Sequence, residues 1–471
     1  MMRSVFTLLL IPCFLLADFS EERIKALEAR IYQLEYDHND SSVMINDMQI
    51  VVDEVEKKSF TDIVDFTPEV RLRFDKMKYK VGDFESQHDP LSASDNRENI
   101  NKDFDIASSV RFRLNMNAKL FDELQFHGRL VFQHSTQSNE RLCILSKEIK
   151  SSGSVSGVDL DRAYFDYLLN SGSEYPVIFS FGVLPTSGGT PLQYAEVRAR
   201  QSVFPALVFD MDSYGVIFTS KLSTLFSQET FLRAVIAQAY TLDPNIYPYQ
   251  CNRETIDNAD IYGLYLDTHF TRNSLFSIGV NLLDNLKAHP YLGPDVDAEN
   301  SKILGTIVTF GAGIDVSNVN NSGVKMFLHS ALSHGHSNGN EENNGTTGGA
   351  VGNFTNSSYA NGPLVEDLGY ALYSGLLYEL SKSLTLGTEY NYGSEYWFAA
   401  TQGAEDMYNK LATRGHVGEG YVIWNLNRYF FTKVGYMYTK EEYTGSGWHF
   451  GTPILKGGVQ QVGYIQLNAS F

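Results

Sequence analysis

Several kinds of residue are scarce in this 471-residue sequence, and each shortage excludes a class of protein. It has 3 Cys, too few for the disulfide framework of a small secreted domain. Lys and Arg number 37 against 56 Asp and Glu, which argues against nucleic-acid binding because phosphates need a basic surface. After residue 17, no apolar run reaches the roughly 20 residues of a membrane-spanning helix. Hydrophobic residues still make up 43% of the chain, so wholesale disorder is excluded too.

Residues 1–17 have the pattern of a secretory signal peptide. Arg3 precedes the apolar run VFTLLLIPCFLLA, which ends at Ala17 and, at about 13 residues, is too short to span a bilayer. Cys13 lacks the small neighbours of a lipoprotein cleavage site, so we expect no lipid anchor. The exported chain then keeps Cys143 and Cys251, and the sequence leaves open whether these two form a disulfide.

Residues 18–58 predict a coiled-coil helix, which we place in the periplasm. Asp18 and Glu21 have the spacing of a helix-capping box, and an apolar heptad follows from Ile24 to Val55. One apolar stripe of this length requires a partner helix, so we favour a self-associating coil and a homo-oligomer, with a trimer as one option. A turn within residues 37–42 would instead make a helical hairpin.

Beyond residue 59 the apolar residues recur with the period of two that is typical of strands. Residues 110–120 alternate between apolar side chains and Arg, Asn or Lys, and the pattern resumes after a two-residue turn. The expected strands are 70–79, 106–121, 124–134, 158–168, 177–183, 213–221, 229–240, 259–270, 274–285, 302–316, 323–333, 367–380, 383–393, 413–426, 429–440 and 459–471.

An exported chain with about sixteen such strands predicts an all-β transmembrane antiparallel barrel over 59–471. Long and short connections alternate, and Tyr is abundant, as expected for a barrel in the bacterial outer membrane with short periplasmic turns. Closing the sheet into a barrel gives the backbone groups of every strand edge a hydrogen-bond partner. This is required because the interior of a lipid bilayer holds no water that could bind them. A soluble β-sandwich would explain the alternation but not the alternating connection lengths. The terminal Phe471 ends an amphipathic strand, like the signal that barrel-assembly machinery reads.

The size of the barrel predicts its function. Sixteen strands enclose a water-filled lumen, so the expected activity is passive diffusion of ions and small hydrophilic solutes through an outer-membrane porin. The connection 184–212 is expected to fold inward and narrow the channel. Candidate channel-lining and constriction residues are Arg71, Arg73, Arg111, Arg113, Arg129 and Arg162 on the strands and Glu196, Asp210 and Asp212 in the connection. Opposed charges there would create a transverse field, or alternatively would pair and hold the connection to the wall.

Six stretches resemble a family of exported proteins from epsilonproteobacteria. They are LPTSGG (184–189), FDMDSYG (209–215), EYNYGSEYWF (389–398), NKLATRGH (409–416), NRYFF (427–431) and TGSGWHFG (444–451). That family is catalogued as a domain of unknown function, is similar to porins and usually includes an N-terminal coil. The resemblance implies a barrel in the outer membrane and brings no substrate or site residue.

Other kinds of site find little support in the sequence. His329, His334 and His336 lack accompanying carboxylate or cysteine spacing, and the last two are expected in a solvated loop, so we expect no metal and no cofactor. There is no G-x-S-x-G elbow or other nucleophile signature, so we expect no enzyme. One alternative function remains: a structural outer-membrane anchor or surface adhesin, with a sealed barrel and a coil directed toward the cell wall.

Overall fold

The computed structural model describes residues 25, 64–80, 101–103, 105–135, 157–222, 229–239, 259–287, 303–338, 341–342, 362–363, 366–401, 406–443, 453 and 455–471. The chain forms two compact units, Met1–Asp65 with Ala118–Leu120, and Phe66–Asn117 with Phe121–Phe471. The second unit holds the sheet described below. The predicted signal peptide, Cys143 and Cys251 lie outside the described residues, as does the predicted coil apart from Lys25. No helix among the described residues is long and apolar enough to cross a membrane.

The described strands form a closed antiparallel barrel of 16 strands, as predicted. The strands β2 and β3 both pair with β1 and occupy successive parts of one position in the ring. In chain order the barrel strands are β1 (Val64–Lys80), β2 (Asn101–Asp103), β3 (Ala107–Lys119), β4 (Leu124–Ser135), β5 (Gly157–Leu169), β6 (Val177–Leu184), β7 (Ser213–Lys221), β8 (Thr230–Ala239), β9 (Ala259–Thr271), β10 (Ser274–Lys287), β11 (Ile303–Val316), β12 (Val324–Ser337), β15 (Leu368–Ser381), β16 (Leu384–Gly393), β17 (Gly415–Asn425), β18 (Phe430–Tyr443) and β19 (Leu455–Ser470). A separate two-stranded ribbon joins β13 (Glu341–Glu342) to β14 (Gly362–Pro363).

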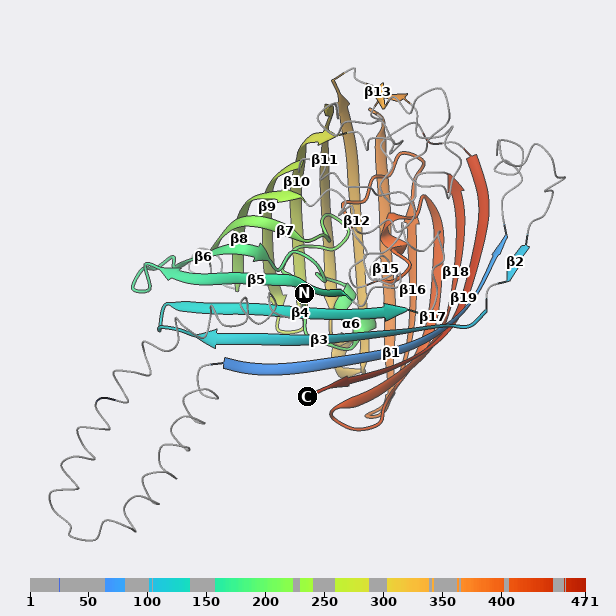
Figure 1. The fold of residues 1–471 in the computed structure, drawn as a ribbon, viewed down its shortest axis with the longest axis horizontal. Coiled ribbons are helices and arrows are strands. Elements are labelled where there is room, and N and C mark those ends of the chain that lie inside the picture. The colour runs from blue at the N-terminus through green and yellow to red at the C-terminus, as the bar shows by residue number, and fades with distance from the viewer. Residues whose placement is uncertain are drawn as a thin grey trace, which may run out of the picture. The chain divides into compact units, whose positions relative to one another are not determined.

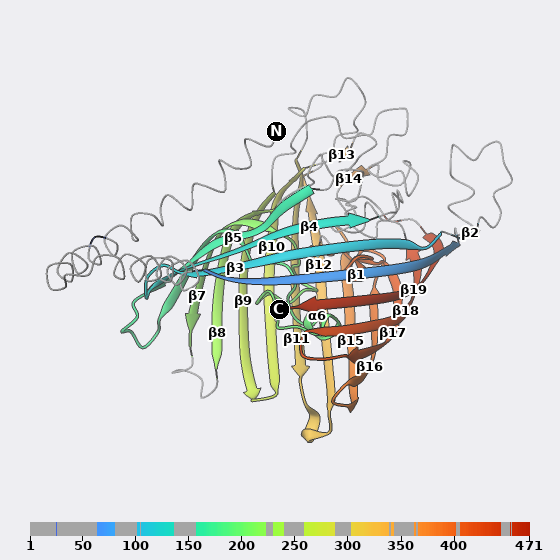
Figure 2. The same ribbon diagram turned by 60° about the horizontal axis from the view of Figure 1, so that its bottom comes forward.

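The first and last strands of the barrel close the ring. Strand β1 pairs with β19 from Glu69 opposite Ser470 to Lys80 opposite Val459, so both edges of the sheet are satisfied. Figures 1 and 2 show these two strands side by side. Both the start of β1 and the end of β19 lie at the end of the barrel where the short turns are, because the number of strands is even.

One expected loop belongs to a strand. The structure corrects the prediction that β12 ends at residue 333, because the strand continues to Ser337 and pairs there with Gly305 of β11. His334 and His336 therefore lie on the exposed face of a strand and not in a loop. His329 points to the other face, where it is buried and its Nε2 lies 3.2 Å from Asp315.

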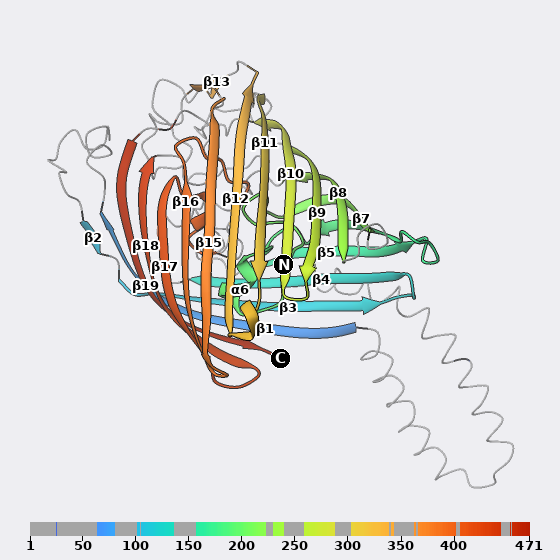
Figure 3. The same cartoon turned by 180° about the vertical axis from the view of Figure 1, so that it is seen from behind.

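The barrel has an apolar outer surface, whereas its inner face carries both apolar and charged side chains. On β15 the outward side chains of Tyr370 and Leu376 are about half exposed, whereas Ala371, Tyr373 and Leu377 point inward and are buried. The inward face also carries the buried charged side chains, among them arginine, aspartate, lysine and glutamate. Figure 3 shows the row of long strands from β8 to β18 in the wall of the barrel.

Inward-facing rings lie close to glycines of the neighbouring strand. A Cβ atom built on any of these glycines would come within 2.4 Å of the ring opposite it in the register, so a larger residue has no room there. The pairs are Tyr265 with Gly279, His329 with Gly313, Phe327 with Gly375, Tyr421 with Gly387, and Tyr464 with Gly435. This pairing fixes the inward side chains close to the wall.

Two connections enter the ring from the end where the long connections are. The first inward segment, residues 185–212, joins β6 to β7 and contains the short helix α6 (Leu192–Glu196). The second inward segment, residues 394–414, joins β16 to β17, contains η6 (Lys410–Ala412) and is described except at 402–405. In all three ribbon views α6 lies within the ring of strands (Figures 1–3).

Candidate functional site: the seam between two inward segments

Arginines of the wall hold the first inward segment through its backbone. The Arg162 guanidinium donates hydrogen bonds to the carbonyls of Ser187, at 2.7 Å, and Gln201, at 2.8 Å. Arg129 donates to the Gln201 side chain at 3.1 Å and forms a two-fold ion pair with Asp161 at 2.7 and 2.8 Å. Asp161 reaches this position because the register of β4 and β5 shifts beside Arg129, which turns two successive residues of β5 inward.

The helix α6 reaches the wall on two sides that are widely separated in the strand order. The Glu196 carboxylate lies 3.7 Å from Arg111 of β3, and the Tyr194 ring stacks on Phe327 of β12 with centroids 5.7 Å apart. The Thr190 hydroxyl donates to Asp315 of β11 at 2.7 Å. The first inward segment therefore crosses the bore of the barrel.

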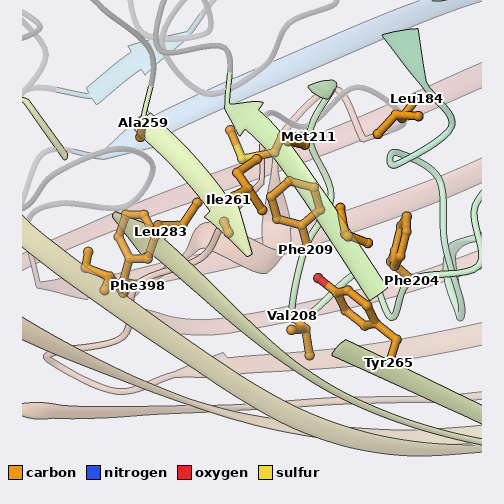
Figure 4. Packing of buried hydrophobic residues seen from close by; sticks show 14 of the residues in the cluster. Leu184, Phe204, Val208, Phe209, Met211, Ala259, Ile261, Tyr265, Leu283 and Phe398 are labelled. Carbon is orange, nitrogen blue, oxygen red and sulfur yellow. The ribbon is translucent and has the colours of Figure 1, made fainter. Parts of the chain in front are cut away.

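Apolar packing fixes the rest of this segment against β9 to β11. Figure 4 shows Phe209 and Met211 close to Ile261 of β9, with Phe204 beside Tyr265 of the same strand. The rings of Phe204 and Tyr265 are 4.5 Å apart between centroids. These side chains are almost completely buried, so this part of the bore is filled.

The second inward segment is tied to itself and to the wall. The Trp397 indole donates to the Leu411 carbonyl at 2.9 Å, and the Arg414 guanidinium donates to the Trp397 carbonyl at 2.8 Å. The Phe398 amide donates to Ser333 of β12 at 3.0 Å. Because Trp397 and Arg414 are buried, these bonds are protected from water and the segment has a defined conformation.

Asp210 joins the two segments. One of its carboxylate oxygens accepts a hydrogen bond from the Gly188 amide at 2.6 Å, within its own segment, and the other accepts from the Thr401 hydroxyl at 3.2 Å, in the second segment. Its backbone amide donates to the Ala400 carbonyl at 2.8 Å. The aspartate is 1% exposed, so this contact is a buried latch between the segments.

A buried charge network links the second segment to the wall. The Lys410 ammonium donates to Glu389 of β16 and, at 2.7 Å, to Glu419 of β17. Tyr373 and Tyr421 donate to Glu389 at 2.6 and 2.7 Å. Burial works to lower the pKa of Lys410, but the two carboxylates outweigh it and raise that pKa well above its ordinary value. Lys410 is therefore a fixed positive charge.

A pocket remains open at the seam where α6, the second segment and the wall strands β1 and β17 to β19 meet. Its empty volume is about 440 Å³. Among its lining residues are Arg73, whose guanidinium carbon lies 4.1 Å from the centroid of the Tyr464 ring, and Lys433, which lies 4.0 Å from that of Tyr421. Asp406 of the second segment also lines the pocket, and burial raises the pKa of its carboxyl above the ordinary value. The pocket is thus lined by charges of both signs.

The structure distributes the residues expected to line the channel over four places. The six arginines, Asp210 and Asp212 are buried, and the Glu196 side chain is 11% exposed. Arg111, Arg129 and Arg162 contact the first segment, which is the arrangement expected if charges hold that segment to the wall. Arg73 and Glu196 line the pocket, and Asp210 lies in the latch between the segments. Arg71, Arg113 and Asp212 lie on other parts of the buried inner surface.

Sequence reasoning missed the second segment with Lys410, and the wall residues Glu389, Glu419 and Lys433. One signal was present: residues 396–400 read YWFAA, an apolar run in a connection that was expected to face water. No cluster of three or more potential metal ligands is found among the residues that the structure describes.

The family model described as "Protein of unknown function (DUF3373)" matches residues 101–468. The predicted resemblance to a family of unknown function is confirmed at this level, whereas an epsilonproteobacterial origin stays a prediction. No curated protein matches the chain.

Solved structures with similar folds have low sequence identity to this chain. OprB of Pseudomonas putida is 10% identical with a TM-score of 0.49, and the alignment covers 89% of this chain and 96% of that one. The trimer form of in-vitro folded OmpT, an outer membrane protein of Vibrio cholerae, is 12% identical with a TM-score of 0.44, covering 87% and 99%. The outer membrane channel DcaP of Acinetobacter baumannii is 14% identical with a TM-score of 0.42, covering 87% and 97%.

Proposed function

We propose that this chain, which belongs to the DUF3373 family of proteins of unknown function, forms a narrow water-filled channel for small hydrophilic solutes and ions. The observation that carries the proposal is the pocket at the seam. Two segments fill much of the bore, yet they leave a space lined by Arg73, Lys433 and Glu196 between them and the wall. On this proposal the space continues through the barrel, and its polar lining lets water and ions pass while excluding larger solutes.

The outer surface supports a place in the bacterial outer membrane. Outward-facing leucines and phenylalanines are accompanied by tyrosines such as Tyr370 and Tyr438, and by Trp424, all of them at least 40% exposed. An apolar outer surface with aromatic side chains near its ends is what a lipid bilayer stabilises. On this proposal lipid surrounds the barrel, the short turns face the periplasm, and a coil at 18–58 lies on that side and mediates self-association.

A specific observation favours a second candidate, a sealed barrel that serves as an anchor or adhesin. Two buried apolar clusters, which contain Phe209 of the first segment and Trp397 of the second, occupy much of the bore. If both segments stay in place and the pocket does not continue through the barrel, no current would pass.

Electrical recording separates the two candidates. Purified protein in a planar lipid bilayer should produce stepwise conductance under the channel proposal, and its absence in folded protein would contradict that proposal. Replacing Ala195, which lines the pocket, with Trp should reduce the step size because the ring fills part of the opening. The matched control is Ala234→Trp on the outward face of β8, which should leave the step unchanged.

A further inference from the structure

Lys433 has an ammonium group whose hydrogen-bonding capacity is unused. It is 3% exposed, and it makes no hydrogen bond to any residue that the structure describes. Its nearest carboxylate is Glu419, at 3.6 Å, and that group already accepts hydrogen bonds from Tyr464 and Lys410. The ammonium group lies near Glu419 and over the rings of Tyr421 and Tyr464, and its three N–H donors remain for a ligand or water to accept from.

Glu196, in the same pocket, presents the complementary case of an acidic group. It belongs to α6 of the first inward segment, whereas Lys433 belongs to β18 of the wall, and both line the pocket. Its closest cation, Arg111, is 3.7 Å away, beyond hydrogen-bond distance, and the carboxylate makes no hydrogen bond within the described part of the chain. The pocket is therefore lined by one group with unused donors and one with an unused acceptor, on two different elements.

Apolar side chains complete the lining. Leu192 and Ala195 of α6 and Met437 of β18 contribute to the same pocket. Its empty volume of about 440 Å³ includes space that is open to solvent, so the pocket has room only for a small solute. The pocket therefore suits a short solute with two charged groups of opposite sign and an aliphatic portion.

We propose that this pocket binds zwitterionic solutes of the α-amino-acid type, with the solute carboxylate on Lys433 and its ammonium group on Glu196. The inference rests on the proposed channel function, because it names the solute class that the channel selects. A solute with only a carboxylate would leave Glu196 unsatisfied and be repelled by it, and a solute with only an amine would be repelled by Lys433. Both charges are needed for full complementarity.

Three probes of similar size test this assignment with the full-length protein. Norvaline carries both charges, pentanoate only the carboxylate and butylamine only the ammonium group. Their binding is measured by titration calorimetry of the folded protein in detergent and by the reduction of single-channel current in bilayers. Norvaline should bind at least about tenfold more tightly than pentanoate or butylamine. Each of these two compounds lacks one charged hydrogen bond, and that loss weakens binding by about tenfold or more.

Variants identify the two groups. Lys433→Gln and Glu196→Gln should each weaken norvaline binding about tenfold or more, and Glu196→Gln should also abolish the discrimination against pentanoate. The matched controls are Lys325→Gln and Glu379→Gln, which remove the same charges from an ion pair of 2.8 Å outside the pocket and should leave binding unchanged. Glu196→Gln keeps the test valid if the buried Lys433 variant fails to fold.

The outcomes separate this inference from the channel proposal. Conductance without binding of norvaline, or equal binding of norvaline and pentanoate, would overturn the zwitterion site and leave the channel standing. Norvaline binding without any conductance would overturn the channel and support the pocket as a binding site. Binding that is lost equally in the variants and in their controls would overturn the assignment of the two groups.

Discussion

Asp210 offers the sharpest test of how the bore is kept narrow. Replacing it with Ala removes the acceptor of the Gly188 amide and of the Thr401 hydroxyl, both of which are buried. A buried group left without its partner costs about 1–3 kcal/mol, so two of them cost about 2–6 kcal/mol. Removal of the buried carboxylate itself offsets part of this cost, and we expect the contact between the two segments to weaken by about 2–4 kcal/mol.

Hydrogen exchange measures this weakening directly. A change of 2–4 kcal/mol corresponds to about 30- to 700-fold faster exchange through local opening, which mass spectrometry would detect in peptides covering 185–212 and 394–414. Exchange in β15 should stay slow, because the wall is untouched. Asp210→Asn keeps an acceptor for the Gly188 amide and should show a smaller effect. Unchanged exchange of both segments in the Ala variant would refute the idea that Asp210 holds them together.

Three further predictions concern the wall of the barrel. Arg129→Ala removes the buried two-fold ion pair with Asp161 and should destabilise the barrel by about 3–5 kcal/mol, measured by urea unfolding in detergent, with Arg129→Lys less affected. Gly435→Ala brings a Cβ within 2.4 Å of the Tyr464 ring and should cost about 1–3 kcal/mol and alter the conductance, whereas Gly463→Ala, whose Cβ meets nothing within 4 Å, should do neither. Deletion of Phe471, which stacks against the turn before β18, should lower the yield of heat-modifiable, folded barrel in membranes; an undiminished yield would exclude it as an assembly signal.

The strands could be predicted because their signal is local. Each strand alternates between the two faces regardless of its neighbours, so Arg111 and Arg113 are assigned to the inner face from spacing alone. Strict alternation does not hold where the register shifts. Arg162 points inward as expected, but its neighbour Asp161 also points inward, at the bulge beside Arg129. A bulge adds one residue to one strand only, and its position depends on the partner strand.

The site could be predicted only in part because its contacts are not local. The first inward segment was expected from its length and its place in the strand order, but nothing in its sequence specifies that Asp210 meets Thr401, 191 residues away. Lys433 was not considered as a site residue, because one lysine on an inward face resembles any other. Its importance depends on the distance to Glu419 and on the rings of Tyr421 and Tyr464, which only the folded ring brings together.

Pairing of β1 with β19 also has a consequence for biogenesis. Among the barrel strands, β1 is synthesised first and β19 last. Because Glu69 of β1 pairs with Ser470 of β19, the outer edge of β1 stays unpaired until synthesis is complete. Every product of premature termination before residue 455 would lack that neighbour and expose two rows of unpaired amides and carbonyls. Such fragments cannot close the ring, so the topology itself distinguishes complete chains from incomplete ones.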